Sequence, residues 1–132
     1  NATVKEQYRM IHKAGGMVIQ AHPFREEPYI PKVCLYPEDC DGAEGINATH
    51  SNSLSMSHNE PKWDDMAIAH CHKHNLPMTA GSDVHSVRLF GGGVAFKRRL
   101  RSISDYCQAI LSGEDYLLTN GEAWFTKTGE RL

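Results

Sequence analysis

The chain has 132 residues, of which 40% are hydrophobic, and this is the size of a single domain with a buried core. Its formal net charge of −2, from 14 basic and 16 acidic side chains, argues against a nucleic-acid footprint. No apolar run reaches membrane-spanning length, and the four cysteines form no Cys-x-x-Cys pair. We therefore expect a cytoplasmic protein with free thiols and no membrane partner.

The first predicted element is a helix over residues 3–14. Thr3 and Glu6 have the spacing of a capping box, in which each side chain bonds the other residue's backbone N–H. A buried strand over residues 17–21 follows directly after two glycines. It ends at His22, because the next residue is a proline, which cannot continue a strand ladder.

The middle of the chain alternates long polar loops with short regular elements. Residues 24–41 contain three prolines and no clear period, which predicts a long loop. A short strand is expected at 43–47, followed by a polar loop over 47–58. Residues 60–74 then form a second predicted helix, for which Asn59 is the expected N-cap.

The last part of the chain begins with a buried strand over residues 76–80. A further strand is expected at 94–96, and a helix follows that starts near Ser102 or Ser104. Two final strands flank Asn120-Gly121, a dipeptide typical of hairpin turns. The alternation of strands and helices predicts an α/β fold with mainly parallel strands and a C-terminal hairpin.

Polar side chains follow two of the predicted parallel strands. Asp83 and His85 come directly after the strand over 76–80, and His22 follows the strand over 17–21. The carboxyl ends of parallel strands gather ligands, and a carboxylate with two imidazoles suits a divalent metal. Extended backbone would place Asp83 and His85 on the same side. Alternatively, Asp83 caps backbone amides in a turn, and His22 bonds a backbone carbonyl.

Other candidate residues keep two interpretations each. Arg25 could bind a phosphate at the same edge of the sheet, or it could be a solvated loop arginine. Glu44 is either a structural carboxylate or a metal ligand. His70 and His74 share a helix face, as a metal pair or as a solvated helix end. The basic residues 97–101 form either a phosphate site or an exposed face.

Two stretches together resemble a known family. Residues 15–23, Gly-Gly-Met-Val-Ile-Gln-Ala-His-Pro, resemble the third motif of the PHP (polymerase and histidinol phosphatase) domain. Residues 74–86, which contain Ala-Gly-Ser-Asp-Val-His-Ser, resemble its fourth motif. The resemblance implies a distorted seven-stranded β/α barrel that binds zinc, manganese or iron. It also implies that His22, Asp83 and His85 are metal ligands.

The resemblance further implies metal-dependent hydrolysis of phosphate esters, with a phosphorylated small molecule or a nucleotide as substrate. Family members open with a His-x-His motif, and this chain has none before His22. We therefore expect residues 1–132 to be the C-terminal portion of a PHP-like domain, a partial barrel that forms a homodimer or pairs with a missing N-terminal part. The alternative is a catalytically inactive metal-binding or interaction domain, and whether the chain is an enzyme is left open.

Overall fold

The fold is known from a computed structural model, which describes residues 1–88 and 91–132. The helices are α1 Val4–Lys13, α2 Ala48–Ser51, α3 Lys62–His74 and α4 Ile103–Leu111. The strands are β1 Ile19–Gln20, β2 Gly42–Asn47, β3 Met78–Gly81, β4 Gly92–Phe96, β5 Tyr116–Asn120 and β6 Trp124–Thr126. Among the described helices, none combines the length and apolar character that crossing a membrane requires.

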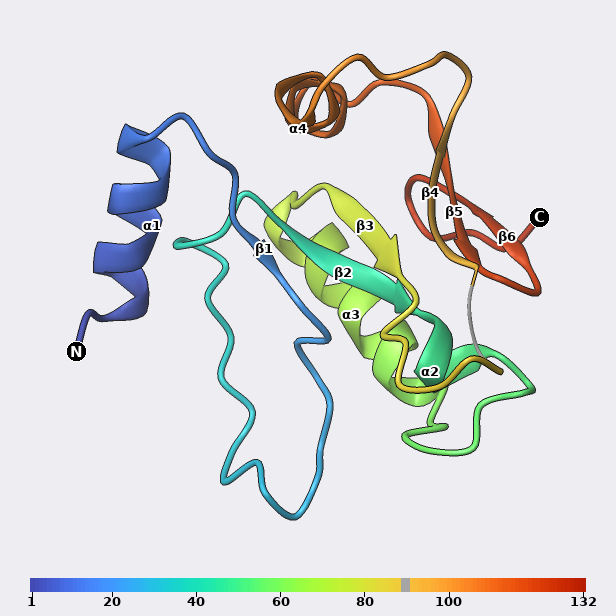
Figure 1. Cartoon of the computed structure of the whole chain (residues 1–132). Helices are drawn as coiled ribbons and strands as arrows, with labels where there is room; N and C mark the ends of the chain where they lie inside the picture. The colour runs from blue at the N-terminus through green and yellow to red at the C-terminus, as the bar shows by residue number, and fades with distance from the viewer. Residues whose placement is uncertain (89–90) are drawn as a thin grey trace.

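The strands form one parallel and one antiparallel sheet. In the order β1-β2-β3, each strand runs parallel to its neighbour, so their carboxyl ends meet at one edge. Helix α3 covers one face of this sheet (Figure 1). Strands β4-β5-β6 are antiparallel, and β5 and β6 form the predicted C-terminal hairpin. The α/β class is confirmed, and the described strands do not close into a barrel.

The two sheets meet where β3 and β4 approach each other. A methyl group on Gly92 would lie 2.5 Å from the carbonyl oxygen of Gly81 and 2.9 Å from Cβ of Ala48. The Ser82 hydroxyl donates a hydrogen bond of 2.8 Å to the carbonyl oxygen of Gly92. The sheets can approach this closely because the residue at position 92 has no side chain.

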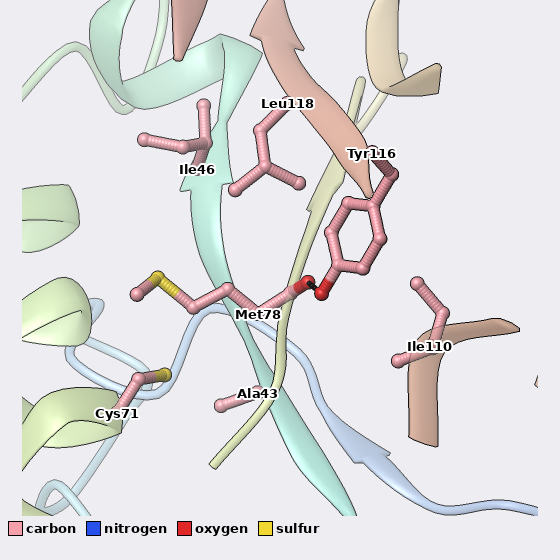
Figure 2. Packing of buried hydrophobic residues seen from close by; sticks show 7 residues of the cluster. All are labelled: Ala43, Ile46, Cys71, Met78, Ile110, Tyr116 and Leu118. Atoms are coloured by element: carbon pink, nitrogen blue, oxygen red, sulfur yellow. Dashed lines mark hydrogen bonds between the residues drawn. The ribbon is translucent and has the colours of Figure 1, made fainter. Parts of the chain in front are cut away.

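The hydrophobic core lies between the sheets and their helices (Figure 2). The Tyr116 hydroxyl donates a hydrogen bond of 2.8 Å to the Met78 carbonyl, which ties the antiparallel sheet to β3. The phenol is therefore buried with its polar atom satisfied. The cluster of buried residues consists of Ala43, Ile46, Cys71, Met78, Ile110, Tyr116 and Leu118.

Most predicted elements are confirmed, with three local corrections. Helix α1 has the expected capping box between Thr3 and Glu6. The prediction of Asn59 as the cap of α3 is wrong, because Pro61 takes that place without a side-chain bond. The Asn59 amide instead donates to the carbonyl oxygen of Asn52 at 3.0 Å. In addition, β1 is shorter than predicted, and the polar stretch after β2 contains the short helix α2.

Adjacent glycines in β4 provide a matched test of the contact between the sheets. Gly92→Ala should lower the free energy of unfolding by about 1–3 kcal/mol, because its methyl group meets backbone that cannot move freely. Gly93→Ala should leave stability unchanged or raise it by up to about 1 kcal/mol, because no atom lies within 4 Å of the added carbon. Urea unfolding of both variants measures the difference, and equal stabilities would contradict this packing.

Candidate functional site

His22 and Asp83 occupy equivalent places at the ends of β1 and β3, the two strands that flank β2. Each lies two positions after the last residue of its strand, β1 for His22 and β3 for Asp83. Both have a left-handed backbone, with φ of 26° at His22 and 50° at Asp83. This conformation costs free energy in residues other than glycine, and such strain is concentrated at functional sites. The extended backbone expected after β3 is therefore wrong at Asp83.

Strand β2 lies between these two ends and connects them by hydrogen bonds. The Glu44 carboxylate accepts a hydrogen bond from the His22 backbone N–H at 2.8 Å and one from the Asn47 amide at 3.0 Å. The same amide lies 3.3 Å from Oδ2 of Asp83. Glu44 therefore has the structural role that was one of its two interpretations, and the three strand ends are held as one unit.

Arg25 enters the site from the loop after β1. It is 5% exposed, and its terminal nitrogen Nη2 donates hydrogen bonds to Oδ2 of Asp83 and, at 3.1 Å, to the Thr49 hydroxyl. From residues 1–88 and 91–132, the Asp83 carboxylate thus accepts hydrogen bonds from side chains and none from backbone amides, unlike in the alternative interpretation. The predicted phosphate contact of Arg25 stays a prediction, since its guanidinium is engaged within the protein.

A buried histidine continues the network behind Arg25. His50 accepts a hydrogen bond at Nε2 from Nε of Arg25, at 3.1 Å. Its other ring nitrogen, Nδ1, lies 2.8 Å from Oδ1 of Asp64. Asp64 also accepts the backbone N–H of Asn47 at 3.2 Å. His50 and Asp64 therefore lie behind the site and link α2 to the first turn of α3.

The charges around Asp83 stabilise its ionised form. Burial opposes ionisation, but the hydrogen bond and positive charge of Arg25, with bonds from Asn47 and Thr49, outweigh it and lower the pKa of Asp83 to about 2. The pKa of His22 is lowered by burial and by the charge of Arg25, against the opposing effect of Glu44 and Asp83. The site thus presents an anionic carboxylate beside an imidazole that favours its neutral form.

His85 lies at the outer side of Asp83. Its Nδ1 is 2.7 Å from the Asp83 carbonyl oxygen and 3.6 Å from Oδ1 of the same residue. A carbonyl oxygen only accepts hydrogen bonds, so Nδ1 carries the proton and Nε2 of the neutral ring carries the lone pair. This arrangement, with Nδ1–H on a backbone carbonyl, is common in metal-binding histidines.

The donor chemistry at this edge fits a divalent metal. Asp83 Oδ1 accepts no hydrogen bond from the described residues, and His22 and His85 contribute imidazole nitrogens. Their placement is incomplete, since residues 1–88 and 91–132 contain no group of three or more His, Cys, Asp or Glu side chains close enough to hold an ion. The three residues could therefore supply part of a metal site.

A recess of about 360 Å³ adjoins the site on the side of His85. Hydroxyls of Thr49, Ser55 and Ser57 line it, together with Met56 and the cationic Arg88. It shares Thr49 and His85 with the strand-end site. The recess can therefore accept a small polar group that is bound next to Asp83.

Several residues of the site were not found by sequence reasoning. The sequence predicts only a strand end at Asn47 and indicates no role for Thr49, His50 or Asp64. One signal could have revealed part of the set, because Asn47, Thr49 and His50 directly follow β2 and so lie at the same edge as the other strand ends. Asp64 had no such signal, since it reaches the site from a helix.

The histidines of α3 lie apart from this site. The rings of His70 and His74 are 4.7 Å apart, and His72 bonds the Thr128 carbonyl at 2.7 Å. Nε2 of His70 is buried without a hydrogen-bond partner in the described part of the chain. Its ring packs edge-on against Phe24, with ring centroids 5.5 Å apart. His70 is thus a buried residue of the helix face rather than part of a solvated end.

Residues 61–114 match the family model described as PHP-associated. The matched segment includes α3, β3, Asp83, His85 and α4. Residues 61–114 are therefore similar to the PHP-associated family, and the resemblance predicted from the sequence is confirmed over this segment. No curated protein and no solved structure matches the chain.

His70 makes stability dependent on pH. Its pKa is lowered from 6.5 by burial and by the nearby charges of His74 and Lys73, so the fold favours the neutral ring. The stabilising contribution of the neutral His70 ring should be complete above pH 6.5. It should decrease as the pH drops below that value, because the unfolded chain binds the proton more readily than the folded chain. His70→Leu should reduce this loss.

Urea unfolding of the wild type and of His70→Leu at about pH 7.5 and about pH 5.5 measures the effect. His72→Ala is the matched control, because His72 is exposed on the same helix. If His70→Leu and His72→Ala lose the same stability on acidification as the wild type, the buried ring is not the cause.

Proposed function

We propose that this chain supplies His22, Asp83 and His85 as ligands of the metal site of a PHP-type phosphoesterase. The proposal concerns residues 1–132 as the C-terminal portion of a distorted β/α barrel, with further ligands contributed from outside these residues. The metal is zinc, manganese or iron, and the substrate is a phosphorylated small molecule or a nucleotide. The PHP-associated match over residues 61–114 supports the family, and it includes two of the three ligands.

One observation carries the proposal. His22 and Asp83 follow β1 and β3, whose carboxyl ends flank that of β2 at one edge of the parallel sheet, and both have a strained left-handed backbone. Such strain persists only where surrounding contacts maintain it, and here Glu44 and Asn47 hold both strand ends. Both residues lie two positions beyond the end of a strand, and both have a backbone conformation that costs free energy. This coincidence favours a functional role over an ordinary turn.

The chain's own residues would perform binding and orientation. A bound divalent metal would lower the pKa of a coordinated water and neutralise phosphoryl oxygens. Asp83 offers Oδ1 while Oδ2 is held by Arg25, and His22 favours the neutral state that metal binding requires. The recess beside His85 would receive the organic group of the ester, with Arg88 and the serine hydroxyls facing it.

A second candidate function is a catalytically inactive domain derived from the same barrel. It is favoured by the absence of a three-donor group within residues 1–88 and 91–132. Such a domain would bind a metal weakly or bind a partner without turnover. The two candidates differ in whether added metal produces hydrolysis.

Pairing with another polypeptide is part of the proposal. Helix α1 is amphipathic but contains no buried residue, and Met10 is 66% exposed. Strand β1 lies at the edge of its sheet and is bonded to β2 on one side. A second copy, or the N-terminal part of a PHP domain, would cover these surfaces. Light scattering of the purified chain should therefore report a dimer, and a monomer at high concentration would count against the second copy.

Binding of Mn²⁺ to the purified chain tests the proposed ligands. Calorimetric titration should detect a site in the wild type. His22→Ala and Asp83→Asn should each weaken binding at least about tenfold, because each removes one of three donors. His72→Ala should bind as the wild type does, because its ring nitrogen Nε2 bonds the Thr128 carbonyl and not a residue at the strand ends.

A phosphatase assay with added Mn²⁺ separates the two candidate functions. Turnover that is lost in Asp83→Asn would support the phosphoesterase, and binding without turnover would favour the inactive domain. The metal proposal would be refuted by a wild type that binds no Mn²⁺, or by equal affinities of the wild type, His22→Ala and Asp83→Asn.

A further inference from the structure

The two oxygens of Asp83 have different surroundings. Oδ2 accepts one hydrogen bond from Arg25 and lies 3.3 Å from the Asn47 amide and 3.2 Å from the Thr49 hydroxyl. Oδ1 accepts no hydrogen bond from the described residues, and Nδ1 of His85 lies 3.6 Å away. One oxygen is thus fixed by the protein, and the other faces the outer side of the site.

The donor and the acceptor can be assigned in the hydrogen bonds that link Arg25 to His50 and His50 to Asp64. An arginine side chain only donates, so Nε2 of His50 must be an unprotonated acceptor for Arg25. The ring proton therefore lies on Nδ1 and is donated to Asp64 at 2.8 Å. The result is a directed chain in which Asp64 orients His50, His50 orients Arg25, and Arg25 holds Asp83.

The three side chains behind Asp83 are almost fully buried. His50 is 1% exposed, while Arg25 and Asp64 are 5% exposed. Trp63 packs edge-on against His50, with ring centroids 5.1 Å apart. Buried polar groups are stable only when they are hydrogen-bonded, so losing one member would leave its neighbours without partners. This interdependence gives the guanidinium one well-defined position.

We infer that Asp64, His50 and Arg25 form a positioning chain that anchors Asp83 through Oδ2 and reserves Oδ1 for a divalent cation. The inference deepens the proposed function and, for its second half, rests on it. Arg25 carries a positive charge and could instead compete with the metal for Asp83. The separate surroundings of Oδ1 and Oδ2 favour positioning, because Arg25 leaves the outer oxygen available.

The first measurement needs no metal and no variant. Long-range ¹H–¹⁵N correlation NMR of the wild-type chain should show His50 in the neutral form with its proton on Nδ1. A proton on Nε2, or a doubly protonated ring at neutral pH, would overturn the positioning chain, because Nε2 could not accept from Arg25.

The second measurement is Mn²⁺ affinity by calorimetry. Arg25→Lys keeps the charge but replaces the planar guanidinium, whose Nε and Nη2 both bond His50, with a single ammonium group, so the affinity should fall about 10–100-fold. Thr49→Val is the milder second variant, because it removes one acceptor of Arg25 and nearly conserves the buried volume, and it should weaken binding several-fold. Arg98→Lys is the matched control, because Arg98 bonds Asp105 and Glu114 away from the site, and its affinity should equal that of the wild type.

The outcomes distinguish the positioning chain from the proposed function. Unchanged or tighter Mn²⁺ binding by Arg25→Lys, with binding retained in the wild type, would overturn the inference and identify Arg25 as a competitor of the cation. A wild type that binds no Mn²⁺ would overturn the proposed function and the role of Oδ1. In that case a proton on Nδ1 of His50 would still support the anchoring of Asp83 through Oδ2.

Discussion

The ion pair between Arg25 and Asp83 is the contact on which the strand-end site depends. Arg25 is almost fully buried, and a buried charge is tolerated only with partners that satisfy it. Removing one partner of such a pair costs about 3–5 kcal/mol, because the other charge stays buried without compensation. The pair also joins two distant parts of the chain, since Arg25 follows β1 and Asp83 follows β3. Its geometry therefore decides how the two strand ends face each other.

The parallel sheet makes this contact achievable. Strand β2 separates β1 from β3, and its end contributes Asn47, whose side chain donates to Glu44 and Asp83 and accepts from the Thr49 backbone N–H. Asn47 also caps the short helix α2, which carries Thr49 and His50 under Arg25. The left-handed conformations at His22 and Asp83 are maintained by this network rather than by local sequence preference. The site is thus a product of sheet topology and buried polar bonding together.

Sequence reasoning found the elements that depend on local signals. The capping box at Thr3, the Asn120-Gly121 hairpin and the glycine-flanked strands follow from short-range chemistry. The positions of His22 and Asp83 just beyond β1 and β3 could be predicted, because a polar residue directly after an apolar run is evident in the sequence. The partner of Asp83 was not, because nothing local indicates that Arg25 turns inward across 58 residues. Asp64 was likewise beyond reach, since its approach to His50 depends on how α3 packs on the sheet.

Paramagnetic broadening by Mn²⁺ in a ¹H–¹⁵N NMR spectrum of the chain tests the central claim most directly, because it locates the bound ion without relying on a variant. We expect the backbone amides of His22, Asp83 and His85 to broaden first, while those of α4 stay sharp. Broadening centred on His70 and His74, or spread evenly over the surface, would contradict a metal site built from the ends of β1 and β3.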